Sequence, residues 1–215
     1  MKPTVMAARA SAPHAAFARL RRAVSRLFLP GLGAMAVAAA MFFCAPVTAQ
    51  PASVDKNFPL PPTLTGFKKG EITDFESKKP GLGQSVNYAR QGWRADIYIY
   101  DLGLKSILSG PKSNVIAKQM EQAKQDIFGI QKAGHYSEVK MKASFDITNA
   151  AGKPVFSCLS LQLVRKDMGA TDSYLCLTGS ANKFVKVRLS TAQAANSEEI
   201  AKRFVTELAG IIPVR

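Results

Sequence analysis

Two cysteines of this 215-residue chain have the spacing of a cross-strand pair. Residues 154–190 contain three apolar runs separated by short polar turns, a pattern typical of antiparallel hairpins. If the first turn is centred on Asp167, Cys158 lies opposite Cys176 on the same face of the sheet. Directly opposed residues bring their Cβ atoms to about 4.5–5.5 Å, close to disulfide reach. The sequence therefore predicts a Cys158–Cys176 disulfide, with two free, half-buried thiols as the alternative.

The same strands carry basic side chains around a tyrosine. Turns centred on Ala151 and Ala181 place leucines and valines together on one buried face, with Leu177 opposite Val185, and polar groups on the outer face. The predicted binding residues of this outer face are Lys140, Lys142, Tyr174, Lys186 and Arg188. Cations beside a hydroxyl suit a carboxylate, a phosphate or an acidic partner. The alternative is a solvated face, which antiparallel sheets commonly have.

Catalytic, metal and cofactor motifs are not found in the sequence. His135 is the one histidine beyond residue 49, and it has no partners at metal-ligand spacing. There is no G-x-S-x-G nucleophile motif, and Gly81-x-Gly83 is read as part of a turn. The sequence therefore predicts a non-enzymatic protein with no catalytic residue, metal or cofactor. A small hydrolase or transferase with a dispersed site is the alternative, and it requires a deep pocket that joins His135 to a carboxylate or a serine.

The elements that would position these residues are strands and two amphipathic helices. Strands are expected at 68–76, 84–90 and 93–102, followed by a four-strand meander from Tyr136 to Ser190, whose first hairpin pairs Phe145 with Ser157. The helices are expected from Ser113 or Asn114 to about Gly134, and over 197–212. Their apolar stripes are Ile116, Met120, Ala123, Ile127 and Ile130 in the first helix, and Ile200, Phe204, Leu208 and Ile211 in the second. Asn196 and Glu199 have the spacing of a capping box. The predicted class is α+β, an antiparallel sheet covered by the two helices.

The strand at 93–102 has side chains suited to packing on both faces. Ile97 and Ile99 point one way, and Asp96, Tyr98 and Tyr100 point the other way. This pattern predicts a central strand. Its tyrosines either pack against the sheet or form a binding platform.

The N-terminal residues 1–49 have the pattern of a secretory signal peptide. A basic stretch without acidic residues precedes the apolar segment 27–43, and small residues lead to a predicted cleavage between Ala49 and Gln50. Arg21-Arg22 leaves open whether the Sec or the twin-arginine route is used. The prediction is a periplasmic or secreted protein, where a disulfide is favoured. The alternative is a retained membrane anchor.

The charge and the composition of the exported chain limit the classes of partner that it is expected to bind. Residues 1–49 hold six of the 29 basic residues and none of the 15 acidic ones, so 23 basic and 15 acidic residues remain, a net charge of +8. This balance favours anionic partners, while export argues against nucleic acid. Residues 50–66 are a proline-rich, extended lead-in, and residues 67–215 are the predicted single domain. Phe58, Leu60 and Leu64 would pin the lead-in to it.

The order of elements resembles the PsbP/Mog1-type fold, on the basis of the YIYDLG strand and the closing helix 197–212. The resemblance spans residues 67–213, has no residue motif, and implies an accessory or assembly role. The function predicted from the sequence is an exported envelope protein that binds an anionic ligand or an envelope protein through a basic sheet face. It touches the membrane only through an uncleaved signal. A structural component that assembles through its lead-in is a further alternative.

Overall fold

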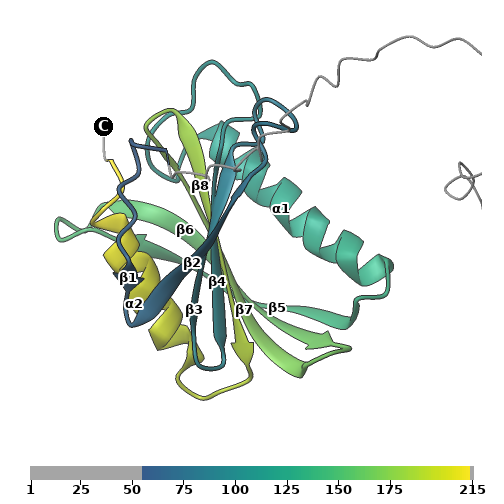
Figure 1. The fold of residues 1–215 in the computed structure, drawn as a ribbon. Helices are drawn as coiled ribbons and strands as arrows, with labels where there is room; N and C mark the ends of the chain where they lie inside the picture. The colour runs from purple at the N-terminus through teal and green to yellow at the C-terminus, as the bar shows by residue number, and fades with distance from the viewer. Residues whose placement is uncertain (1–54, 214–215) are drawn as a thin grey trace, which may run out of the picture. The chain divides into compact units, whose positions relative to one another are not determined.

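Eight antiparallel strands form one sheet in the computed structural model, which describes residues 55–213. The strands are β1 (Thr63–Leu64), β2 (Phe67–Asp74), β3 (Gln84–Arg90), β4 (Trp93–Tyr100), β5 (Tyr136–Thr148), β6 (Pro154–Arg165), β7 (Gly169–Ser180) and β8 (Lys183–Ala192). Their order across the sheet is β1-β2-β3-β4-β8-β7-β6-β5, so β4 lies in the interior (Figure 1). Two helices accompany the sheet in the described part of the chain, and the predicted α+β class is confirmed. The predicted signal peptide and its cleavage site lie outside the described residues.

The two helices cover opposite faces of the sheet. Helix α1 (Asn114–Lys132) packs its Ala123 and Ile127 against a cluster that contains Leu175. Helix α2 (Ser197–Ala209) packs against the cluster that contains Cys176. Consecutive residues of a strand point to opposite faces, so α1 and α2 lie on the two sides of β7 (Figure 1). Neither described helix is both long enough and apolar enough to cross a membrane.

The helix starts differ from each other in their capping. The Ser113 hydroxyl accepts a hydrogen bond from the Ile116 N–H at 3.3 Å, as expected of an N-cap residue. Asn196 forms no side-chain cap hydrogen bond, so the predicted capping box at α2 is wrong. Glu198 and Glu199 in the first turn of α2 instead place negative charge at the positive end of the helix dipole.

The predicted pairing of β7 with β8 is wrong by one residue. The turn consists of Ala181 and Asn182, both with positive φ (44° and 61°), and Ser180 pairs with Lys183. A two-residue turn of this kind has its centre between the two residues, whereas the prediction centred it on Ala181. Val185, Val187 and Leu189 therefore lie on the same face of the sheet as Cys176. Lys186 and Arg188 lie on the opposite face, with Leu177 and Leu175 of β7.

A β-bulge makes the predicted register of the β5–β6 hairpin wrong as well. The register between β5 and β6 shifts between Met141 and Ala143, so Phe145 pairs with Cys158 instead of Ser157. The extra residue is Lys142, and it reverses the faces of the residues that follow it. Val139 and Met141 therefore lie on the α1 face, and Phe145 and Ile147 lie on the α2 face.

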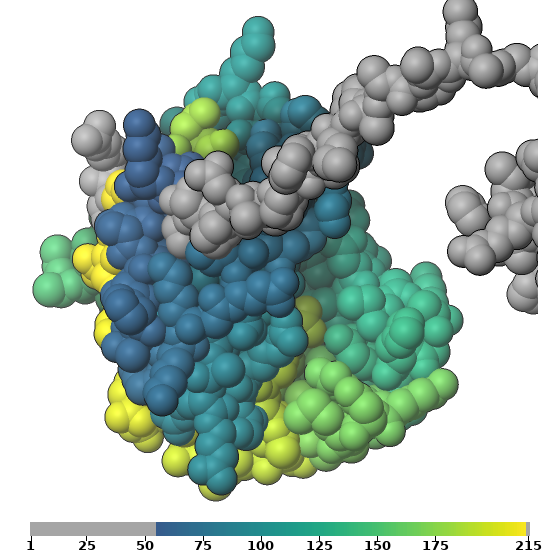
Figure 2. All heavy atoms as spheres, in the orientation of Figure 1, coloured from purple at the N-terminus to yellow at the C-terminus, as the bar shows by residue number. Residues whose placement is uncertain are grey.

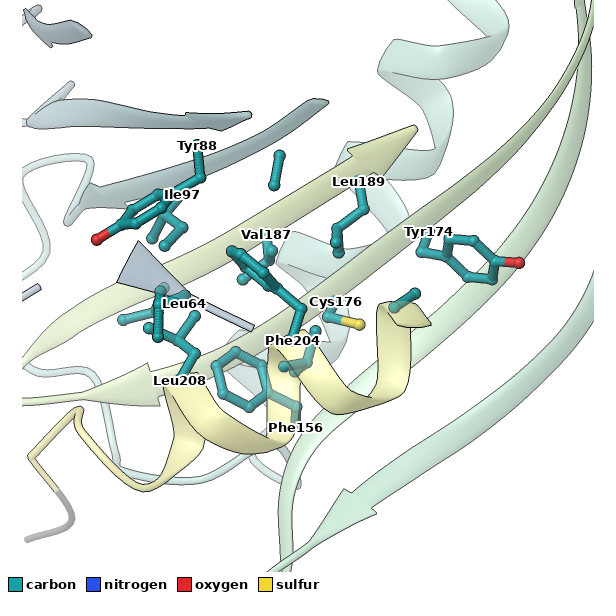
Figure 3. Packing of buried hydrophobic residues seen from close by; sticks show 14 of the residues in the cluster. Leu64, Tyr88, Ile97, Phe156, Tyr174, Cys176, Val187, Leu189, Phe204 and Leu208 are labelled. Carbon is teal, nitrogen blue, oxygen red and sulfur yellow. The ribbon is translucent and has the colours of Figure 1, made fainter. Parts of the chain in front are cut away.

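The main core lies between α2 and the sheet. Phe204 and Leu208 of α2 are fully buried, and Figure 3 shows them beside Leu64 and Val187. The Phe204 ring contacts the Phe67 ring edge-on, with centroids 4.9 Å apart. Part of the proline-rich segment belongs to the same cluster: it contributes the buried side chains of Phe58, Leu60 and Leu64. The Tyr88 hydroxyl donates to the Pro61 carbonyl at 2.6 Å, which fastens this segment to β3.

Candidate functional site

A cleft of about 750 Å³ lies between α1 and the sheet. Helix α1 contributes Ala123, Asp126, Ile127 and Ile130 to its lining. The sheet contributes Arg94, Asp96 and Tyr98 of β4, Leu175 of β7, and Lys186, Arg188 and Ser190 of β8. Tyr136 at the start of β5, Arg165 at the end of β6 and Met168 in the β6–β7 turn complete the lining. The cleft is thus partly apolar, with four cationic and two anionic side chains on its wall.

Strand alternation places the charged residues of the cleft. On β4 the isoleucines face the α2 core and Asp96, Tyr98 and Tyr100 point the other way, as the sequence predicts, which places these three residues on the α1 face. The register pairs Tyr98 with Lys186 and Asp96 with Arg188. Paired residues share one face of a sheet, so the two cations of β8 stand beside the polar side chains of β4 under the helix.

Lys186 is held over two aromatic rings. Its ammonium nitrogen lies 4.7 Å from the Tyr98 ring centroid and 5.4 Å from the Tyr100 centroid. Such cation–π contacts stabilise the charged amine. Burial lowers the pKa of Lys186, and the carboxylate of Asp126 acts in the opposite direction. Within residues 55–213 Lys186 forms no ion pair.

Arg188 is the second cation of the cleft without a carboxylate partner. Its Nε donates to the Ser173 hydroxyl at 3.0 Å, and it forms no ion pair among the described residues. Burial lowers the pKa of the Arg188 guanidinium below its ordinary value. Asp96, its cross-strand neighbour, is already engaged, since it accepts hydrogen bonds from Asn87 at 3.0 Å and from Arg94 at 2.9 Å. Lys186 and Arg188 therefore present two half-buried positive charges to the cleft.

The other predicted binding residues do not join this pair. Tyr174 lies 3% exposed under α2, on the opposite face of the sheet, and its hydroxyl is 2.8 Å from Ser197 Oγ. Lys140 and Lys142 are exposed on β5, at the edge of the sheet. The prediction that Lys142, Tyr174 and Arg188 share one outer face is therefore wrong, and the cause is the shifted turn and the bulge.

The predicted disulfide is present. Cys158 and Cys176 are opposed across β6 and β7 and are bonded through their sulfurs at 2.04 Å. Both are 1% exposed and belong to the α2 core, so the bond is a structural link inside the protein rather than part of the cleft.

His135 does not lie in a deep pocket. It is exposed just after α1 and lines a shallow hollow with Lys166 and Asp167, and Asp167 is paired with Arg165 at 2.6 Å. Within residues 55–213 no group of three or more His, Cys, Asp or Glu side chains is placed to hold a metal ion. The hollow brings His135 beside the Asp167 carboxylate, but His135 is exposed and Asp167 is already paired with Arg165.

The buried Tyr100 gives the stability of the domain a measurable pH response. Burial raises the pKa of Tyr100 to about 12, against about 10 for a free tyrosine. Between these values the unfolded chain ionises and the folded chain stays neutral, so stability is lost as the pH rises. We expect Tyr100→Phe to reduce the loss of unfolding free energy from pH 10 to 12 by about 2 kcal/mol, measured by urea denaturation. The neutral-pH value for each protein is the control. Equal alkaline losses in variant and wild type would contradict the burial of this phenol.

Comparisons with known proteins relate the chain to others at the level of fold. A scan with protein-family models and a search of curated proteins find no match. Among solved structures, cyanobacterial PsbP (CyanoP) from Synechocystis sp. PCC 6803 is similar, with 13% identity, a TM-score of 0.45, and coverage of 76% of this chain and 91% of that one. The Ran-binding protein Mog1p from Saccharomyces cerevisiae is similar with 8% identity, a TM-score of 0.32, and coverage of 70% and 93%. The resemblance in element order predicted from the sequence is thus confirmed as a weak structural resemblance without a motif match.

Proposed function

We propose that this protein is an exported, non-enzymatic binding or accessory protein of the cell envelope that holds an anionic group in the cleft between α1 and the sheet. The observation that carries the proposal is the position of Lys186 and Arg188. They lie two residues apart on the cleft face of β8, and neither forms an ion pair in residues 55–213. The signal-peptide pattern and the buried disulfide support export.

The energetics of the cleft favour an anion. Removing a cation from water costs free energy unless a counter-charge or hydrogen bonds replace the lost hydration. Tyrosine rings and one serine hydroxyl replace part of it at Lys186 and Arg188. A carboxylate or phosphate would supply the missing charge, and the planar Arg188 guanidinium can bind either through two parallel hydrogen bonds.

The apolar lining defines the rest of the ligand. Ile127 and Leu175 border the two cations, and Met168 lies at the rim. The volume lies within the range of about 300–1,000 Å³ that small-molecule sites occupy. We therefore propose a carboxylate or phosphate attached to an apolar or aromatic body, either as a free small molecule or as an acidic side chain of a partner.

Arg188→Met tests this proposal with phenyl phosphate as the probe. Methionine keeps most of the buried volume and removes the charge, so we expect phenyl phosphate binding, measured by isothermal titration calorimetry, to weaken at least about tenfold. Lys140→Met is the matched control, because Lys140 is an exposed cation on β5 outside the cleft. It is expected to leave the affinity within a factor of about two.

Two results would contradict the proposal. Equal weakening by Lys140→Met and Arg188→Met would show that binding follows the net charge of the protein. Unchanged phenyl phosphate binding by a folded Arg188→Met protein would show that the anion binds outside the cleft. Thermal denaturation of each variant establishes that the fold is intact.

A further inference from the structure

Exposed leucines gather at one end of the sheet. Leu82 is 39% exposed, Leu102 47%, Leu104 43% and Leu108 67%. They lie in residues 75–83, between β2 and β3, and residues 101–113, between β4 and α1, which we call the leucine loops. The other exposed large hydrophobic residues of the described chain are Val115, Ile130, Met141 and Met168. Half of such residues in the described chain therefore fall in two loops.

Backbone contacts hold the leucine loops together. The Leu102 N–H donates to the Gly81 carbonyl at 2.7 Å, and a Cβ on Gly81 would come within 2.9 Å of the Leu102 carbonyl carbon. Gly110 exchanges two backbone hydrogen bonds with Gly179 of β7, at 2.8 and 3.2 Å. Asn182 of the β7–β8 turn accepts the Ile107 N–H at 2.8 Å. The loops and this turn thus form one surface at the upper end of the sheet in Figure 1, where the teal segment projects in Figure 2.

Leu102 adopts an unfavourable backbone conformation at this end. Its φ is +56°, in the left-handed region that bulky residues rarely occupy. A glycine would adopt this φ without steric cost. The leucine side chain does not offset the cost by burial, since nearly half of it is exposed. Such a feature is expected where an exposed side chain serves binding.

The polar residues of the leucine loops leave a positive surface. Lys78, Lys79 and Lys105 are exposed and form no ion pair among the described residues. The Glu76 carboxylate accepts the N–H groups of Gly81 and Gly83 and keeps its negative charge. The carboxylate of Asp101 forms an ion pair at 2.5 Å with Lys183, which belongs to β8 and lies outside the loops. Residues 75–83 and 101–113 together carry four lysines and two carboxylates, so the loops combine exposed leucines with an excess of positive charge.

We propose that the leucine loops dock on an anionic phospholipid surface. Leucine partitions into the acyl boundary of a bilayer, and lysines near an anionic leaflet gain electrostatic attraction. The same composition fits a protein partner less well, because protein interfaces are depleted in lysine and take most of their energy from tyrosine, tryptophan and arginine. This surface goes beyond the sequence-based expectation that the protein meets a membrane only through an uncleaved signal.

Vesicle co-sedimentation tests the proposal. The chain beginning at Gln50 is mixed with vesicles of phosphatidylcholine alone or of equal parts phosphatidylcholine and phosphatidylglycerol. We expect binding to the anionic vesicles that falls as salt rises. A double variant with Leu104→Ser and Leu108→Ser is expected to bind the anionic vesicles at least about tenfold more weakly. A triple variant with Lys78→Glu, Lys79→Glu and Lys105→Glu is expected to lose at least as much vesicle binding. Met141→Ser, at a residue of β5 that is 37% exposed and lies outside both the loops and the cleft, is the matched control and is expected to bind as the wild type does.

Other outcomes would overturn the proposal. Equal vesicle binding by all variants would place the lipid contact elsewhere. A dimer on size-exclusion chromatography that only the leucine variant loses, with no vesicle binding by the wild type, would assign the surface to a second copy of the chain. Phenyl phosphate binding uses Lys186 and Arg188, so the failure of the lipid proposal is distinguishable from failure of the cleft proposal.

Discussion

A chain that lacks residues 50–64 is expected to lose its cooperative unfolding transition. The deletion removes the buried side chains of Phe58, Leu60 and Leu64, together with the pairing of β1 with β2. It also removes the Pro61 carbonyl that accepts the Tyr88 hydroxyl. Each large apolar side chain lost from a core costs about 2–5 kcal/mol, and total stabilities are about 5–15 kcal/mol. The sum of these losses is comparable to the whole stability of the domain.

Circular dichroism during urea denaturation measures this effect. Two neighbouring residues of β1 supply the matched pair of variants. Leu64→Ala should cost about 2–5 kcal/mol, because Leu64 is 0% exposed, whereas exposed Thr63→Ala should change stability by less than about 0.5 kcal/mol. A deletion variant with an unchanged midpoint would contradict the burial and would restore the interpretation of this segment as a separable assembly element.

Removal of the Cys158–Cys176 disulfide is expected to lower the free energy of unfolding by about 3 kcal/mol. The two cysteines are 18 residues apart, and closing a loop of this size restricts the unfolded chain by about that amount in the chain-entropy model. Both sulfurs lie in the α2 core, so a reductant reaches them only when this region opens.

Urea denaturation of Cys158→Ala with Cys176→Ala, compared with the wild type, measures the loss. Wild type denatured with dithiothreitol present should match the double variant, since the bond is then absent from the unfolded state of both. A midpoint that is the same with and without the bond would mean that the link adds no stability to this domain.

The elements of the fold follow from the sequence more closely than their registers do. Period-two alternation locates the strands, and the cysteine spacing fixes the pairing of β6 with β7. The β7–β8 register depends on two consecutive residues, Ala181 and Asn182, adopting positive φ. The alternation of apolar and polar residues does not determine whether two consecutive residues adopt positive φ. A half-residue change in the turn centre moves every residue of the next strand to the opposite face of the sheet.

The candidate site follows from the sequence in part, for the same reason. Lys186 and Arg188 were predicted as binding residues and line the cleft, whereas Tyr174 lies beneath α2. One signal was available: β7 carries apolar side chains at both Leu175 and Cys176, which is expected of a strand covered on two faces. With both faces covered, a basic sheet face becomes the wall of a cleft.

The position of Lys140 and Lys142 at the end of the sheet has a separate consequence. β5 is 13 residues long and has its only described strand neighbour on one side, so its other side carries unpaired N–H and C=O groups. Long free edges of this kind recruit strands from other molecules and lead to aggregation. Exposed lysines and the bulge at Lys142 interrupt a flat edge and repel a second copy. We therefore expect these two cations to protect the protein from polymerising through its own sheet.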